Sequence, residues 1–172
     1  RHRGRNSYGR TDRSSAADPA WSDVHAIWSA HRPPRAWHGD PGAKSWVKHL
    51  EEADRQTTDW VRLHGNFPSH RLIVAGDFNM TLHADKGYGH KDGRRMVRDR
   101  LPLAGMVCAT AIDIRNVAHG ALERDNIDHI CLDQRLKLVG GPYAIPGLTK
   151  EGERLSDHNG MVVEVHMKAP PP

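Results

Sequence analysis

The chain has 172 residues, a length that suits one domain, and hydrophobic residues make up 37% of it. No apolar run approaches the roughly 18 residues that a membrane span needs, so a membrane-spanning protein is excluded. The net charge of +4 falls in the first 13 residues, which hold five arginines and one aspartate, while the rest of the chain is neutral overall. The two cysteines, Cys108 and Cys131, exclude a disulfide-rich scaffold and favour a cytoplasmic location.

Residues 1–20 hold almost no bulky apolar side chains, so they cannot bury enough surface to offset the entropy of ordering. We expect them to form a disordered basic arm or the remnant of a truncated N-terminal portion, and residues 21–168 to form the domain. Arginines in such an arm can bind phosphates through counterion release, which leaves a nucleic-acid-binding arm as an alternative.

The next part of the chain predicts a strand, a helix and a second strand. Residues 24–30 are typical of a strand, and residues 32–43 carry three prolines and two glycines, as a loop does. Apolar side chains recur at helical spacing over residues 44–64, which predicts a helix. The run 71–75 is continuously apolar, as expected of a strand that is covered on both faces.

A second helix is predicted at 93–101, after a loop over 80–92, with Asp92 as its N-cap. Three further strands are expected, at 106–111, 127–132 and 160–167. Two loops separate them, at 113–126 and 140–159. This order of elements indicates an α/β fold in which helices flank a mixed sheet. Cys108 and Cys131 both fall in apolar strands and are expected to be inert core thiols.

Three short polar segments lie at the ends of predicted strands. They are Gly76-Asp77-Phe78-Asn79, Asn126-Ile127-Asp128-His129 and Ser156-Asp157-His158-Asn159-Gly160. In α/β folds, ligands bind at strand ends, where loops present polar groups. Each segment alone is also typical of a turn or a surface, but three of them in this arrangement indicate one site. Arg94 and Arg95, further along the chain, fit a phosphate contact or a solvated helix start equally well.

The three segments, in this order, resemble the C-terminal half of the endonuclease/exonuclease/phosphatase superfamily. These metal-dependent phosphodiesterases include deoxyribonuclease I and the exonuclease III-type abasic-site endonucleases. The resemblance covers roughly residues 22–167 in the order of elements, and its specific signal lies in the three segments. It implies part of a four-layered α/β sandwich, with a mixed sheet flanked by helices.

The resemblance also implies roles for single residues. Asp77 would orient or deprotonate the attacking water, and Asn79 would hold the phosphate or the water. Asp128 would fix the orientation of His158, which would contact the scissile phosphate. These side chains suit the reaction, because a charged histidine can stabilise the charge that develops on a phosphoryl group.

Two further roles concern the metal and the first strand. The resemblance implies that Asp157 helps to bind a metal ion, together with Asp77, and hard cations such as Mg²⁺ or Mn²⁺ prefer carboxylate oxygens. His31 follows the predicted strand 24–30 and matches, more loosely, a strand-end histidine of the deoxyribonuclease-like branch.

The resemblance breaks down in the N-terminal half, where the family carries an early Asn and a metal-binding Glu. Residues 1–20 match neither motif, and Glu51 and Glu52 fall on the solvated face of a predicted helix. We therefore expect a fragment of an Mg²⁺- or Mn²⁺-dependent hydrolase with weakened metal binding. Its substrate stays open among DNA, RNA, inositol phosphates and lipid phosphodiesters. The alternative is a non-catalytic remnant that binds a phosphorylated ligand or a partner chain, or that self-associates through an exposed sheet face.

Overall fold

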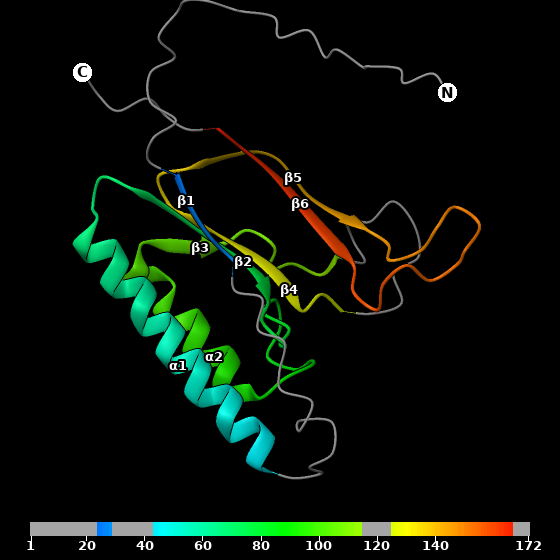
Figure 1. Ribbon diagram of the computed structural model, residues 1–172, viewed down its shortest axis with the longest axis horizontal. Helices are drawn as coiled ribbons and strands as arrows, with labels where there is room; N and C mark the ends of the chain where they lie inside the picture. The colour runs from blue at the N-terminus through cyan, green and yellow to red at the C-terminus, as the bar shows by residue number, and fades with distance from the viewer. Residues whose placement is uncertain (1–23, 29–42, 115–124, 167–172) are drawn as a thin grey trace, which may run out of the picture.

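The computed structural model describes residues 24–28, 43–114 and 125–166 (Figure 1). The expectations for residues 1–20, for His31 and for the loop 32–43 lie outside these residues, except that Ala43 is the first residue of helix α1. For strand β1 (Val24–Trp28) the backbone alone is described.

A four-stranded mixed sheet forms the centre of the fold. Strand β1 runs parallel to β2 (Arg71–Asp77), and β4 (Asp128–Asp133) pairs with β2 in the antiparallel sense. The short strand β3 (Met106–Cys108) pairs with β4 at the edge, which gives the order β1-β2-β4-β3. The predicted mixed α/β class is confirmed at this level.

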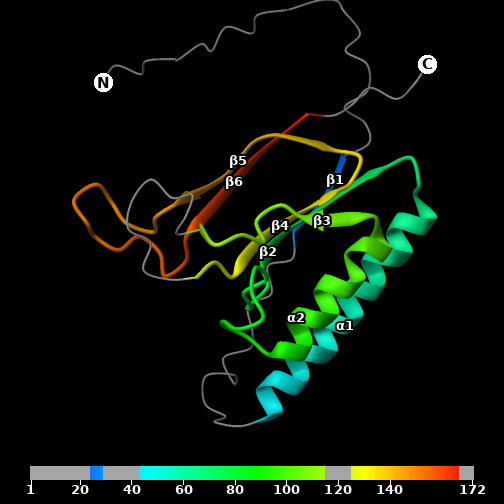
Figure 2. The same cartoon turned by 180° about the vertical axis from the view of Figure 1, so that it is seen from behind.

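Two helices cover one face of this sheet. Helix α1 (Ala43–Asn66) connects β1 to β2, and α2 (Lys91–Arg100) follows β2, with a short 3₁₀ turn η3 (Pro102–Ala104) after it. Figure 2 shows both helices on one side of the sheet and a two-stranded sheet on the other. None of the helices described is long and apolar enough to cross a membrane.

The N-cap of α2 differs from the prediction. His90 occupies the cap, and its Nδ1 accepts a hydrogen bond from the amide of Asp92 at 3.2 Å. Because the helix begins at Lys91, Asp92 lies in its first turn, where a carboxylate still interacts favourably with the helix dipole.

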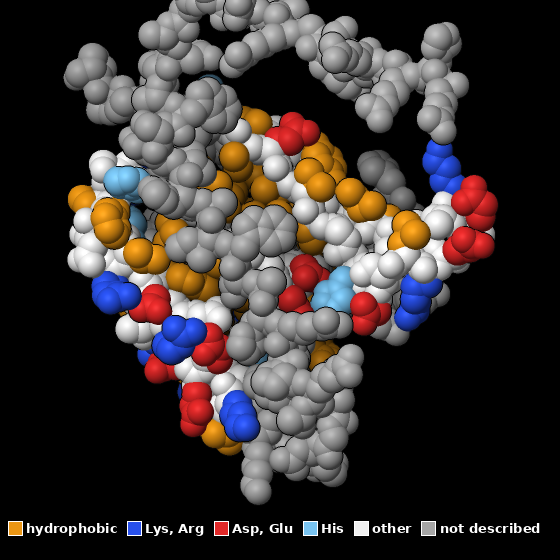
Figure 3. All heavy atoms as spheres, viewed as in Figure 1, with side chains coloured by type: hydrophobic (Ala, Val, Ile, Leu, Met, Phe, Trp, Pro, Cys, Tyr) orange, Lys and Arg blue, Asp and Glu red, His pale blue; other side chains and the backbone are white. Residues whose placement is uncertain are grey.

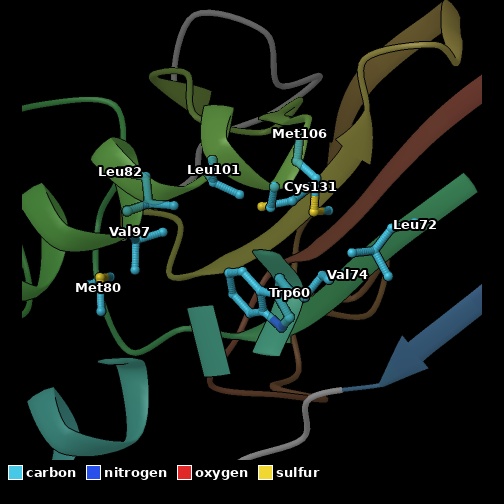
Figure 4. Close-up of a cluster of buried hydrophobic side chains, with 10 residues drawn as sticks. Trp60, Leu72, Val74, Met80, Leu82, Val97, Leu101, Met106 and Cys131 are labelled. Atoms are coloured by element: carbon cyan, nitrogen blue, oxygen red, sulfur yellow. The ribbon is translucent and has the colours of Figure 1, made fainter. Parts of the chain in front are cut away.

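The main hydrophobic core lies between the helices and the central sheet (Figure 4). Trp60 of α1 is buried in the same cluster as side chains of β2, β4 and α2, in line with its helical spacing. Ten buried side chains form this core: Trp60, Leu72, Val74, Met80, Leu82, Val97, Leu101, Ala104, Met106 and Cys131.

The second sheet corrects the predicted loop at 140–159. Strand β5 (Lys137–Ile145) pairs antiparallel with β6 (Gly160–His166), so residues 140–145 are strand. Gly140, Gly141 and Pro142 obscure the strand in the sequence because glycine and proline usually interrupt one. Here the pairing register shifts on both sides of Gly140, and the irregularity absorbs these residues.

Strand β3 is shorter than the predicted strand at 106–111. Beyond Cys108 the amide of Ile130 donates to the side-chain hydroxyl of Thr110 at 2.9 Å instead of to a backbone carbonyl. A side-chain acceptor therefore replaces the ladder and ends regular pairing at this edge.

Candidate functional site

The site begins where β2 ends and β4 starts. Asp77 is the last residue of β2, and the antiparallel register places it directly opposite Asp128, the first residue of β4. Directly opposite residues of an antiparallel pair project to the same face. The fold therefore brings together two of the three polar segments, and it does so through backbone pairing.

The turn after β2 orients the Asp77 carboxylate. The backbone amide of Asn79 donates to Asp77 Oδ1 at 2.7 Å, and its side-chain amide donates to Oδ2 at 3.0 Å. Asn79 has a φ of 50°, a left-handed conformation that Asn tolerates better than most residues. Asn79 thus holds Asp77 through both of its oxygens, while each oxygen keeps a second lone pair.

His158 completes the site from the loop that precedes β6. Its Nδ1 lies 2.6 Å from Asp128 Oδ2, and the two side chains are 33% and 26% exposed. The amide of His158 donates to the Ser156 hydroxyl at 3.0 Å, which shapes the turn that presents the ring. With Nδ1 bound to Asp128, Nε2 is the ring nitrogen that remains for a ligand.

Donor atoms of Asp77, Asp128 and His158 all lie within 4.8 Å of one another. On the face shown in Figure 3, acidic side chains lie against a histidine near the start of β6. Three segments that are distant in the sequence therefore converge on one point of the described chain.

The charges at this point perturb two pKa values. Burial raises the pKa of Asp77 above its ordinary value, and the nearby charge of Asp128 adds to the rise although Asn79 opposes it. Burial alone would lower the pKa of His158, but the hydrogen bond and the charge of Asp128, assisted by Asp77 and Asp157, raise it above 6.5. The site therefore favours a histidinium beside two carboxyl groups.

His129 supports the site from the opposite face of β4, a role that its position in the sequence did not predict. Its Nε2–H donates to the carbonyl of Met80 at 2.9 Å, and its Nδ1 lies 3.2 Å from the hydroxyl of Thr110. The ring is 1% exposed, so it ties β4 to the turn that carries Asn79. The sequence does indicate which way this ring points: successive side chains of a strand face opposite sides of the sheet, so His129 must point away from its neighbour Asp128.

Arg94 has a structural position rather than a phosphate-facing one. It is 4% exposed, and its guanidinium donates to backbone carbonyls of the loop after Asn79. The four acceptors, at 2.7 to 3.1 Å, are the carbonyl oxygens of Asp85, Gly87, Tyr88 and Gly89. The interpretation of Arg94 as a phosphate contact is therefore wrong: this residue holds the loop beside the site.

A hollow between α1 and the end of β2 adjoins the site. Asp77 and Asn79 line one side of it, and α1 lines the other with His49 and Trp60. The Nε2–H of His49 donates to the carbonyl of Phe78 at 3.1 Å, so α1 also holds the turn in place. The hollow leaves room beside the Asp77 carboxylate.

The remaining predicted residues are not part of this group. Asp157 is exposed in the loop before β6 and lies outside the set of three residues that the structure gathers, although its charge acts on His158. His31 lies outside the described residues. The resemblance implied that Asp77 and Asp157 bind the metal ion together. In the structure the carboxylate that lies close to Asp77 is that of Asp128 instead.

Comparisons with protein-family models, with curated proteins and with solved structures gave no match for this chain. The residues of the site itself therefore provide the argument about function.

Proposed function

We propose that this chain is a metal-dependent phosphoesterase that hydrolyses a phosphodiester or phosphomonoester with an activated water. We further propose that its fold is the C-terminal part of a four-layered α/β sandwich of the endonuclease/exonuclease/phosphatase kind. One observation carries the proposal: the His158–Asp128 pair opens onto Asp77, with donor atoms of all three within 4.8 Å.

In this proposal His158 contacts the phosphate and Asp77 activates the water. Asp128 holds Nδ1–H of the His158 imidazolium, which leaves Nε2–H to donate to a phosphoryl oxygen. Asp77, held by Asn79, accepts a proton from the attacking water. General acid–base groups in such positions contribute about 10²- to 10⁴-fold to a rate.

The donor set fits a hard divalent cation. Asp77 and Asp128 bring two carboxylates together. Burial and the negative charge of Asp128 both disfavour the ionised form of Asp77, and a bound cation would stabilise that form. When bound there, Mg²⁺ or Mn²⁺ would neutralise phosphate charge and polarise the phosphoryl group.

The alternative function is a non-catalytic remnant that binds a phosphorylated ligand or a partner chain. It is favoured by apolar side chains on the outer face of the β5–β6 sheet, where Tyr143, Ile145 and Val162 are 42%, 54% and 40% exposed. Hydrophobic side chains also appear on the surface along these strands in Figure 3. Patches of this kind often mark interaction surfaces.

The test is hydrolysis of bis(4-nitrophenyl) phosphate near neutral pH with added Mg²⁺ or Mn²⁺. We expect metal-dependent turnover that Asp77→Asn lowers by about 10²-fold or more. Asp99→Asn makes the same chemical change at an exposed position of α2 and should leave the rate unchanged. Turnover at the level of buffer alone, or equal rates for the two variants, would support the remnant instead.

A further inference from the structure

The two cysteines of the chain face each other across strands β3 and β4. Cys108 and Cys131 are directly opposite in the antiparallel register. The amide of Ala109 donates to the carbonyl of Ile130 at 2.9 Å, so the neighbouring pair is hydrogen-bonded. Since the two kinds of pair alternate, the cysteines occupy a non-hydrogen-bonded pair, the kind with the shorter Cα–Cα distance of about 4.5 Å.

This spacing suits a disulfide. Disulfide-bonded cysteines have Cα atoms usually about 4.4 to 6.8 Å apart, and opposite residues point their Cβ atoms to the same face. Both cysteines are free thiols in this structure. Their side chains therefore need little backbone movement to join.

The two thiols differ in solvent accessibility and in the direction of their pKa shifts. Cys131 is fully buried in the main core, whereas Cys108 is partly buried on edge strand β3. The hydrogen bond from Cys131 lowers the pKa of the Cys108 thiol although burial opposes this shift, and His129 and Thr110 lower it further. The Cys108 sulfur lies 3.7 Å from the Thr110 hydroxyl. Cys108 is thus the more accessible sulfur and the one that a peroxide reaches first.

We propose that Cys108 and Cys131 are a redox modification site, which a peroxide converts into a reversible cross-strand disulfide. Cys108 thiolate attacks one peroxide oxygen, the oxygen–oxygen bond breaks, and Cys108 sulfenic acid forms with release of hydroxide. The Cys131 sulfur then attacks the Cys108 sulfur, the sulfur–oxygen bond breaks, and water leaves with the Cys131 proton. The two thiols lose two electrons in total, and the peroxide gains them.

This inference is independent of the proposed phosphoesterase, because its readout is covalent. Folded protein is treated with stoichiometric hydrogen peroxide, blocked with an alkylating agent and cleaved with trypsin without reduction. The cysteines fall in separate peptides, 101–115 and 125–135. We expect these two peptides to be joined, with the loss of two hydrogen atoms, and to separate again after dithiothreitol.

A variant tests the order of the steps. In Cys131→Ala the second step is impossible, so dimedone should trap sulfenic acid at Cys108; circular dichroism reports whether this variant folds. The wild-type measurement stands even if it does not. The proposal is overturned if wild-type Cys108 is trapped or over-oxidised while the peptides stay separate. It is also overturned if peptide 101–115 links to a second copy of itself, or if neither thiol reacts before the protein unfolds.

Discussion

Replacing Asp128 with Asn tests how the site holds His158 in its cationic form. The amide keeps the shape of the carboxylate and can accept from Nδ1–H, but it removes the charge that lies 2.6 Å from the ring nitrogen. Burial of His158 lowers its pKa, and Asp128 is the main group that outweighs burial. The pKa of His158 should therefore fall in Asp128→Asn.

The size of the effect follows from the kind of hydrogen bond that is lost. A hydrogen bond to a charged group contributes about 1.5–3 kcal/mol and a neutral one about 0.5–1.5 kcal/mol, so the change removes about 1–1.5 kcal/mol. Solvent reaches both side chains, which are 33% and 26% exposed, and this favours the lower end. Because about 1.4 kcal/mol corresponds to tenfold in rate, loss of this hydrogen bond should lower kcat/KM by about 5- to 10-fold near neutral pH, and loss of Asp128 as a carboxylate for the cation would add to the fall.

Two assays measure this prediction. The His158 ring proton signal, followed by NMR across the pH range, gives the pKa in wild type and in Asp128→Asn, and phosphodiester hydrolysis gives the rate. Asp99→Asn serves as the matched control for loss of one surface carboxylate. An unchanged His158 pKa in Asp128→Asn would refute the reasoning, because the pair would then carry no electrostatic coupling.

Three further predictions concern the supports of the site and of the fold. In Gly147→Ala the new Cβ would lie 2.5 Å from the carbonyl oxygen of His158, so the loop that carries His158 must move. The same NMR titration should then show that the raised pKa of His158 is lost, while the circular dichroism spectrum stays unchanged. Arg94→Met removes four hydrogen bonds to loop carbonyls and should lower the free energy of unfolding by about 4 kcal/mol in urea titrations, at about 1 kcal/mol each; an unchanged midpoint would argue against the clamp. Burial would raise the pKa of Asp133, but Arg135 lowers it below 3.8. The pair of Asp133 and Arg135 therefore stabilises the fold above pH 3.8, and this contribution is lost as the pH falls through the lowered pKa of Asp133. Arg135→Met should cost about 2–3 kcal/mol at neutral pH and less in acid, where equal losses at both pH values would contradict the pairing.

The long elements could be predicted from the sequence because their periodicity is strong. Helix α1 has a helical repeat of apolar residues, and β2 has a continuous apolar run. In the structure Leu72 and Val74 are buried in the main core, whereas the alternate residues of β2 are half-buried, so the expected full burial of both faces is met on one face only. Strand β5 could not be predicted, because Gly140, Gly141 and Pro142 suppress the strand pattern and only pairing with β6 rescues it. Local pattern fails where a tertiary partner decides the conformation.

The site shows the same division. The order of three motifs predicted that Asp77, Asp128 and His158 lie in one site. The strand register that places Asp77 opposite Asp128 depends on pairing between segments that are distant in the sequence, so it could not be predicted. His129 and Arg94 act through backbone carbonyls, and a carbonyl acceptor leaves no mark in a sequence. Strand alternation indicates that His129 points away from Asp128, but the acceptors of both side chains were visible only in three dimensions.

The most direct test of the account is a double-mutant cycle in metal-supplemented hydrolysis of bis(4-nitrophenyl) phosphate, with Asp77→Asn and His158→Gln, separately and combined. Residues that act as one catalytic unit are strongly non-additive, so the double variant should lose about as much activity as either single variant. Wild-type hydrolysis no faster than buffer with metal alone, or single variants as active as wild type, would contradict the claim that these residues form a phosphoesterase site.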